Sequence, residues 1–463
     1  MASQESSLHN GRSSSESGQK LPPATPIYVL RGHTSPIHSL NFYSKNSRLI
    51  SGDAEGWVVV WDTTSKRAVA AWKAHDGAIL GVVGVDVELQ EGLEKRIFTH
   101  GRDHKLCVWR LNNKDEDVVG NRLPVDTQNG LLERNEPWLL HSLAVNALNF
   151  CAFGYCFLPL NFGSRSKDAT EGQTKSPLPP QMLLAVPNAL NTGGLDIFHL
   201  PSERRLCVIT PDDKVNTGMV MALEVFILPQ SDEIYIVSGY EDGSAMVHAR
   251  RGPVECPAAT ERTHSNSSWS WELLYTSRPH SQPVLSLDIT PFLGRGYFIT
   301  SSADAIIVKH PIPKLPPPLE PDVTNVGSGV ETMHLKSINT KHAGQQGLRI
   351  RSDNRIFATA GWDNRIRVYS CKSMNELAVL KWHKEGCYSI AFAEIDIDPS
   401  GTKGAEDSTG IDSNLESKNT ALTQSNEPRS LSAIKQQRNI KAQLTHWIAA
   451  GSKDGKISLW DIY

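Results

Sequence analysis

The sequence lacks long apolar runs, a strong charge of either sign and paired cysteines. No apolar stretch approaches the roughly 20 residues that a membrane-spanning helix needs. The 47 Lys and Arg residues nearly balance the 50 Asp and Glu residues, and the net charge of -3 gives no basis for non-specific binding to nucleic acid or membranes. The seven Cys residues form no CxxC pair, which argues against a zinc site or a disulfide framework. Because the N-terminus also lacks the charged and then apolar order of a secretory signal, we expect a soluble, intracellular chain.

The common motifs of catalysis are missing as well. The sequence contains no GxxxxGKS/T phosphate loop, no GxSxG nucleophile turn and no HExxH zinc motif. The best candidate for a catalytic cluster is His280, Asp304 and His310, which a repeat pattern described below already explains. We therefore expect a protein that is not an enzyme and has no cofactor, metal or small-molecule substrate. A hydrolase is the enzymatic alternative, and an activity assay would test it.

What the sequence does contain is a unit that recurs seven times. Complete copies have a His, a short alternating apolar run, a turn rich in Gly and Asp, and a second apolar run that ends in an aromatic residue. The first copy runs from His33 to Trp61 and the last from His383 to Trp460. Neighbouring His residues are 42 residues apart at His33 and His75. Short runs of β-branched and aromatic residues between turns predict three or four strands in each unit.

This period resembles the WD-repeat family, in which each repeat of roughly 40–45 residues forms one four-stranded blade. The resemblance implies an all-β fold, a seven-bladed WD40 β-propeller. A propeller must join its last blade to its first, or it leaves an exposed sheet edge. The chain ends two residues after Trp460-Asp461, where a third strand finishes, and residues 27–30 (Ile-Tyr-Val-Leu) can supply the missing one. We therefore expect the N-terminal strand to close the ring beside residues 456–461.

The composition divides the chain into a tail and one domain. Residues 1–24 are mostly Ser, Gly, Gln and Pro and predict a disordered N-terminal tail, so residues 25–463 hold the propeller. The irregular spacing of the middle units predicts four long loop insertions, at 112–137, 159–181, 311–329 and 396–440. The last of these is polar and predicts a long disordered loop. The best candidate for a helix, residues 433–444, begins inside it.

Within the WD-repeat family, a His, a Ser or Thr, an Asp and a Trp of each repeat form a buried hydrogen-bond network. The resemblance implies structural roles for the corresponding residues here, because buried polar groups must be paired. They are His33, Ser51 and Trp61; His75, Thr99, Asp103 and Trp109; His280, Thr300 and Asp304; His342, Thr359 and Asp363; and His383, Asp454 and Trp460. Only the second unit is complete. Glu55 stands at the Asp position of the first unit, and Ala450 at the hydroxyl position of the last.

A protein-binding scaffold is the function that this architecture favours. A propeller offers rigid faces and a channel mouth, and aromatic side chains contribute strongly to protein interfaces. Trp57, Tyr240 and Trp362 lie in or beside the predicted turns and are candidate partner contacts. Alternatively, Trp57 and Trp362 only cover blade edges.

Two further functions stay open as alternatives. The letters Trp362-Asp363-Asn364-Arg365 match a box found in substrate receptors of cullin-type ubiquitin ligases, although here they stand before a strand rather than after it. Five Arg residues between 349 and 367 are the densest basic segment, but strand alternation splits them between two faces. We therefore expect protein partners and no direct contact with nucleic acid or membrane.

The two ends of the domain resemble one fungal family of WD-repeat proteins, the ASTRA-associated family, whose animal relatives are G-protein β-like. The resemblance rests on Pro26 with residues 28–33 (Tyr-Val-Leu-Arg-Gly-His), on residues 51–56, and on residues 450–463, together with weak middle repeats and a long insertion before the last blade. It implies a nuclear scaffold subunit of the ASTRA complex, tied to chromatin remodelling and to a co-chaperone system that matures phosphatidylinositol-3-kinase-related kinases.

Overall fold

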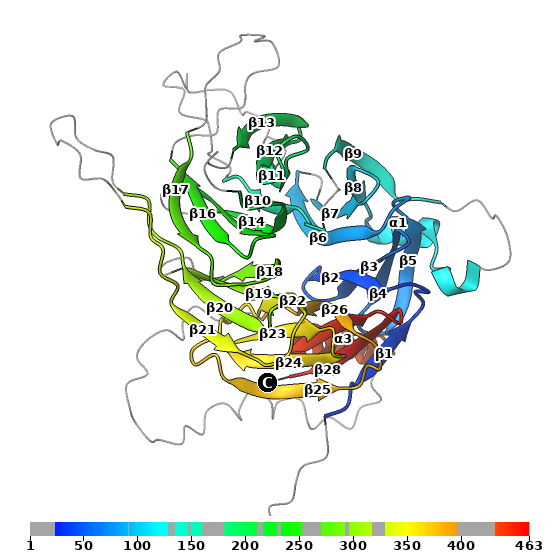
Figure 1. The fold of residues 1–463 in the computed structure, drawn as a ribbon. Coiled ribbons are helices and arrows are strands. Elements are labelled where there is room, and N and C mark those ends of the chain that lie inside the picture. The colour runs from blue at the N-terminus through cyan, green and yellow to red at the C-terminus, as the bar shows by residue number, and fades with distance from the viewer. Residues whose placement is uncertain are drawn as a thin grey trace, which may run out of the picture.

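A computed structural model describes the chain in eleven segments. These are residues 24–90, 92–127, 135–146, 150–159, 180–210, 216–228, 233–251, 270–291, 296–316, 329–395 and 431–462. The described residues form seven four-stranded antiparallel sheets, arranged as blades around a central channel (Figure 1). The predicted all-β, seven-bladed propeller is confirmed.

Each of the first six blades is a run of four consecutive strands, which are antiparallel because short turns join them. Blade 1 has β2 (Ile37–Tyr43), β3 (Arg48–Asp53), β4 (Trp57–Asp62) and β5 (Arg67–Lys73). Blade 2 has β6 (Ile79–Leu89), β7 (Gly92–Gly101), β8 (Lys105–Arg110) and β9 (Trp138–Ala144). Blade 3 has β10 (Gly154–Phe157), β11 (Met182–Pro187), β12 (Leu195–Leu200) and β13 (Arg204–Ile209).

The second half of the ring repeats this order. Blade 4 has β14 (Val220–Leu228), β15 (Glu233–Tyr240), β16 (Ala245–Arg250) and β17 (Glu272–Ser277). Blade 5 has β18 (Val284–Ile289), β19 (Tyr297–Ser302), β20 (Ile306–Pro311) and β21 (Lys336–Asn339). Blade 6 has β22 (Gln345–Ile350), β23 (Ile356–Gly361), β24 (Arg365–Ser370) and β25 (Glu376–Lys381).

Blade 7 joins the two ends of the chain. It consists of β26 (Cys387–Phe392), β27 (Trp447–Ser452), β28 (Lys456–Asp461) and, as its outermost strand, β1 (Tyr28–Arg31). Tyr28 pairs with Leu459 and Arg31 with Lys456, so the N-terminal strand covers the edge of β28 as predicted. Leu30 is only 2% exposed and belongs to a core cluster shared by blades 1 and 7.

Neighbouring blades are held together by apolar side chains and by close backbone contacts at their turns. The core clusters contain residues of adjacent blades, and Trp72 of blade 1 meets Trp109 of blade 2 edge to face. Gly56, in the turn between β3 and β4, has φ of +89°, and a Cβ there would lie 2.0 Å from the carbonyl oxygen of His75 in the next blade. Glycine is therefore required at this position, because only glycine allows both that φ and that approach.

The predicted insertions fall partly outside the described residues. Within 112–137 the structure has a short helix, α1 (Asn113–Val119), and a 3-10 turn, η1 (Pro124–Thr127). Residues 160–179, 317–328 and 396–430, which make up most of the other three, are outside the described part. The prediction of disorder is wrong for 431–440, because helix α3 (Leu431–Leu444) begins there and ends just before β27. Its Ala442 carbonyl accepts a 2.7 Å hydrogen bond from the indole of the buried Trp447, which fixes the end of the helix on blade 7.

The first strand of blade 3 is also displaced from its expected place. The sequence pattern puts it between Val145 and Phe150, but it is β10, which begins at Gly154. His141, expected to open this unit, lies instead on the outer strand β9 of blade 2 and pairs with Glu203. The aromatic cluster of Phe98, Phe153 and Tyr155 packs between blades 2 and 3, and this tertiary contact selects the later strand.

Candidate protein-binding surface

The upper face of the propeller is the end of the ring at which the first strand of every blade begins. Antiparallel order places two kinds of loop there: the loop that enters each blade, and the turn between its second and third strands. All the predicted network His and Asp residues come from these loops and turns. What those residues contact therefore decides which side chains on this face are free to meet a partner.

In blade 2 the structure brings all four predicted residues together. His75 Nδ1 lies 2.8 Å from Asp103 Oδ1, and His75 Nε2 lies 2.7 Å from Thr99 Oγ1. The Trp109 indole donates to the same hydroxyl at 2.9 Å. His75 and Thr99 are buried, so the network satisfies polar groups that would otherwise cost roughly 1–3 kcal/mol each.

Blade 1 forms the same network with a different acid. His33 Nε2 contacts Ser51 Oγ at 2.8 Å and Trp61 donates to that hydroxyl at 2.8 Å, but His33 Nδ1 pairs with Asp53 Oδ2 at 2.7 Å. The other Asp53 oxygen accepts the backbone N–H groups of Glu55 and Trp57. The assignment of the acid position to Glu55 is therefore wrong: Glu55 is exposed, and Asp53 is completely buried.

Blade 7 recovers its missing hydroxyl from the opposite strand. Ala450 faces Ser458 across the β27–β28 pair, and Ser458 Oγ lies 2.7 Å from His383 Nε2 and accepts the Trp460 indole at 2.9 Å. Asp454 does not complete the network, because its carboxylate pairs with Lys456 at 2.5 Å. His383 Nδ1 thus has no hydrogen-bond partner within the described part of the chain, and burial lowers the pKa of this His to about 4.

Blade 5 extends the network into its neighbour. His280 lies 3.3 Å from Asp304 and 2.8 Å from Thr300, whose hydroxyl contacts His310 Nε2 at 2.8 Å. His310 Nδ1 then meets the hydroxyl of Tyr275, on β17 of blade 4, at 2.8 Å. His280 and His310 are both buried, so this cluster fills the core between two blades and presents no open site.

Blade 6 contradicts the prediction for His342. Thr359 donates instead to Gln345 Oε1 at 2.6 Å, and Gln345 is completely buried. The His342 side chain is exposed and lies 3.6 Å from Asp363. Asp363 itself pairs with the buried Arg367 at 2.6 Å. His342, Thr359 and Asp363 therefore form no common network, because a glutamine has replaced the histidine three residues later.

The three candidate contact residues differ in exposure. Tyr240 was wrongly assigned: it is 1% exposed, and its hydroxyl accepts a hydrogen bond from Ser238. Trp57 is half-buried at the start of β4. Trp362 is 48% exposed in the turn between β23 and β24.

Trp362 is held rigidly on the upper face. Its indole donates to Gln346 Oε1 at 2.9 Å, and its ring packs on Gly344, where a Cβ would lie 2.2 Å away. The turn that carries it is tied to the next blade, since Asn364 donates to the Lys384 carbonyl at 3.2 Å. His342, Arg365 and Lys384 belong to the same turn and the two adjoining loops, where His342 lies near Asp363 and both Arg365 and the Lys384 carbonyl contact Asn364. We call Trp362 and these three residues the Trp362 patch.

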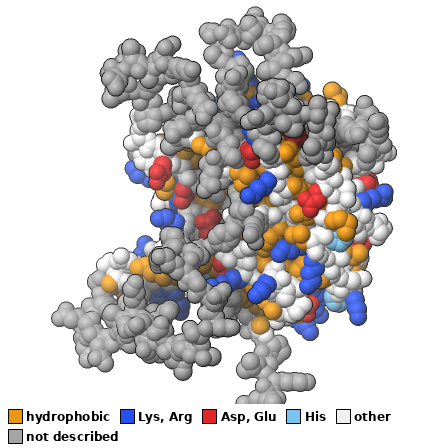
Figure 2. Space-filling model, turned by 90° about the vertical axis from the view of Figure 1, so that its left-hand side faces the viewer, with side chains coloured by type: hydrophobic (Ala, Val, Ile, Leu, Met, Phe, Trp, Pro, Cys, Tyr) orange, Lys and Arg blue, Asp and Glu red, His pale blue; other side chains and the backbone are white. Residues whose placement is uncertain are grey.

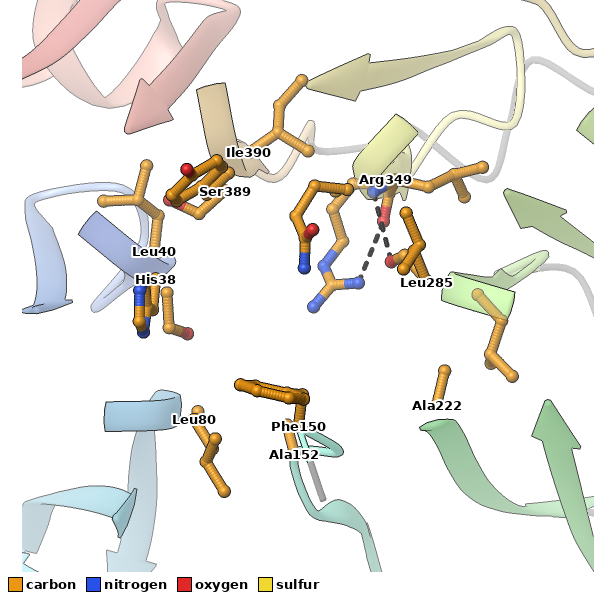
Figure 3. Close-up of a pocket in the computed structure, with 18 of the residues that line it drawn as sticks. His38, Leu40, Leu80, Phe150, Ala152, Ala222, Leu285, Arg349, Ser389 and Ile390 are labelled. Atoms are coloured by element: carbon orange, nitrogen blue, oxygen red, sulfur yellow. Dashed lines mark hydrogen bonds between the residues drawn. The ribbon is translucent and has the colours of Figure 1, made fainter. Parts of the chain in front are cut away.

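The central channel adjoins this patch, because Gln346, which accepts the Trp362 indole N–H, also lines it. It contains a cavity of about 170 Å³, lined by the first strands and strand-entry residues of all seven blades. Figure 3 shows apolar side chains of its wall, among them Leu80, Phe150 and Leu285, with Arg349 pointing from β22 into the space toward Phe150. The sequence did not single out this channel, because each blade contributes only three or four of its residues.

Other kinds of site find little support in the described residues. On the side that carries β17 and β21, Lys and Arg side chains are scattered among acidic and apolar ones (Figure 2). The described part of the chain holds no group of three or more His, Cys, Asp and Glu side chains placed to bind a metal ion. No helix among the described residues is both long and apolar enough to span a membrane. The Trp-Asp-Asn-Arg sequence at residues 362–365 lies in the turn that leads into β24. There Asp363 accepts a hydrogen bond from Arg367 at 2.6 Å.

Sequence reasoning missed four network residues: Asp53, Ser458, Gln345 and Tyr275. Ser458 could have been found from strand alternation, because it is the cross-strand neighbour of Ala450. Asp53 lies two residues from the expected position and could have been weighed against Glu55. Gln345 and Tyr275 carry no such signal, since their roles depend on loop geometry and on a neighbouring blade.

This chain is similar to a known repeat family and to several fungal proteins. The WD40 family model, described as "WD domain, G-beta repeat", matches residues 24–62, 335–370 and 443–461. A protein of Aspergillus niger named ASTRA-associated protein 1 is 52% identical over 96% of this chain and 98% of its own length. Proteins of the same name from Verticillium alfalfae and Schizosaccharomyces pombe are 43% and 33% identical, over 95% and 80% of this chain and 93% of their own lengths.

Proposed function

The chain belongs to the ASTRA-associated protein 1 family of WD-repeat proteins, and from this premise we propose that it is a non-catalytic scaffold subunit of the ASTRA complex. The observation that carries the proposal is the difference in exposure between the aromatic and polar residues of the upper face. The His, Asp and Trp residues that would suggest chemistry are mostly buried in blade networks, while Trp362 is left exposed on a rigid turn. Tryptophan is enriched among the residues that dominate protein interfaces.

The finer parts of the proposal follow from the family resemblance. They are a role in chromatin remodelling, a role in the maturation of phosphatidylinositol-3-kinase-related kinases, and a nuclear location shared with the other ASTRA subunits. Its partners are then proteins, including the kinase co-chaperone components. Affinity purification of the full chain with mass spectrometry tests this. Recovery of the co-chaperone components supports the proposal, and recovery of only trimeric G-protein or ubiquitin-ligase components contradicts it.

Substitution Trp362→Ala is expected to reduce the recovery of at least one co-purifying partner about tenfold or more, because removal of an interface Trp commonly costs 2 kcal/mol or more. The indole is about half exposed, donates to Gln346 and packs on Gly344, so the blade should remain folded without it. The measurement is quantitative mass spectrometry of tagged wild-type and variant protein.

Trp138→Ala is the matched control. Trp138 is 66% exposed, but it lies at the start of the outer strand β9, away from the upper face. Its substitution should leave every partner in place. Equal recovery of all partners with both variants would remove the Trp362 patch from the proposed interface.

A further inference from the structure

Equivalent positions on the first strands form a ring of side chains around the channel axis. In most blades the pairing of the first and second strands shifts between the first and third residues of the first strand, which fixes the equivalence. The fifth residue of each first strand is therefore equivalent from blade to blade. These residues include Asn41 in blade 1, Glu224 in blade 4, Asp288 in blade 5 and Arg349 in blade 6. Three charged side chains from consecutive blades therefore stand at one level around the channel axis, and two of them, Glu224 and Arg349, line the cavity.

Two members of this ring connect adjacent blades. Asn41 Oδ1 accepts the Gly84 N–H of blade 2 at 2.9 Å, and Asp288 Oδ2 accepts the Ile350 N–H of blade 6 at 2.6 Å. Glu224 does not make the equivalent bond, because the N–H of Ile289 donates to Asp288 Oδ1 instead. In the described part of the chain, the Glu224 carboxylate accepts no hydrogen bond. It lines the cavity with its acceptors unused.

The charges around Glu224 leave one negative charge uncompensated when all groups are ionised. Asp288 faces it from β18 and Arg349 from β22, while Tyr155 of β10 and Cys151 just before β10 are its neutral titratable neighbours. Burial raises the pKa of Glu224 to about 8 and also raises the pKa of Asp288, although Arg349 opposes both shifts. A cation bound beside Glu224 would stabilise the charged form of this carboxyl group.

The size and lining of the cavity restrict what that cation can be. The cavity of about 170 Å³ has room for one extended side chain. Leu80, Phe150 and Leu285 offer apolar contacts for an aliphatic stem, and Glu224 offers a carboxylate for a charged end.

We propose that the central channel binds a single cationic side chain, a lysine or an arginine presented by a protein partner, with its charged end paired to Glu224. This rests on the proposed scaffold function, to which it adds the chemistry of one contact. An anion is disfavoured because Arg349 already faces two carboxylates.

The test uses small probes and the full chain, so that it is independent of partner purification. N-acetyl-lysine N-methylamide, its arginine counterpart and its uncharged norleucine counterpart are titrated by calorimetry and by saturation-transfer NMR. Both cationic probes should bind more tightly than norleucine. Affinity should rise about tenfold or more between pH 6 and pH 8.5, because deprotonation of Glu224 is linked to binding. The lysine and arginine titrations show which cation fits better.

Two variants and a control decide the role of Glu224. Glu224→Gln keeps the shape of the side chain and should abolish both the preference for cations and the pH dependence. Arg349→Gln removes the competing guanidinium, so it should tighten binding of the lysine probe once Glu224 is deprotonated. It should also shift the pH dependence to higher pH, because Arg349 lowers the pKa of Glu224. Glu385→Gln, at an exposed position in the loop before β26, should change neither. No binding by the wild-type chain at pH 8.5, or cation binding unchanged in Glu224→Gln, would overturn the proposal.

Discussion

Deletion of residues 1–31 is expected to destabilise the whole propeller, by roughly 4 kcal/mol or more. The deletion removes β1, so the backbone of β28 loses its partner strand and the ring keeps an exposed sheet edge. It also removes Leu30 from the core of blades 1 and 7, and burial of one Leu side chain contributes roughly 1.5–3 kcal/mol. The strand hydrogen bonds add about 1 kcal/mol each. Denaturant unfolding followed by circular dichroism measures the loss.

Deletion of residues 1–24 is the control for this experiment. The first backbone contact of the N-terminal strand is the bond from the Ile27 N–H to the Leu459 carbonyl, so this shorter deletion keeps closure intact. A second pair of variants separates closure from chain length. Leu30→Asp should destabilise strongly, and Tyr28→Asp, at an exposed position of the same strand, only weakly. Equal unfolding midpoints for the two deletions would show that β1 does not close the ring.

Asp53→Ala is expected to lower the free energy of unfolding by about 3–5 kcal/mol. The His33 and Asp53 side chains have no solvent exposure, and loss of the carboxylate leaves His33 Nδ1 buried without its partner. The N–H groups of Glu55 and Trp57 lose their acceptor as well, so the turn between β3 and β4 is weakened together with the network. Thermal and denaturant unfolding of the variant measure the effect.

Glu55→Ala provides the comparison, because the repeat pattern places the network acid at this position. Glu55 is exposed, and surface substitutions of this kind usually change stability by less than about 0.5 kcal/mol. If instead Glu55→Ala were the damaging substitution and Asp53→Ala the harmless one, the hydrogen-bond network of blade 1 described here would be wrong.

The repeat pattern was sufficient to predict the architecture of the protein. Alternating apolar runs between Gly and Asp turns predicted strands, and their period near 42 residues predicted four-stranded blades. The missing strand after Trp460 predicted closure by residues 27–30, which β1 confirms. These features are local or repeat along the chain, so one sequence contains enough of them. The first strand of blade 3 was predicted too early in the chain, because the loop that enters this blade does not follow the repeat pattern.

The contacts of individual side chains depended on tertiary structure. In the sequence, Ala450 stands where the repeat pattern has a Ser or Thr. Only the β27–β28 register shows that Ser458 supplies the missing hydroxyl to the network. Likewise, Tyr240 looked like an exposed turn aromatic, but it is buried beside Ser238.

By itself, then, the sequence determined the class of fold, the number of blades and the strand that closes the ring, because strand periodicity and turn chemistry are written locally. Tertiary structure alone decided which acid pairs with His33, which aromatic side chain stays exposed, and which charges meet in the channel. Those outcomes depend on distances between strands far apart in the chain. Glu224, Asp288 and Arg349 are each unremarkable in sequence, and they share one environment only because seven blades close around a common axis.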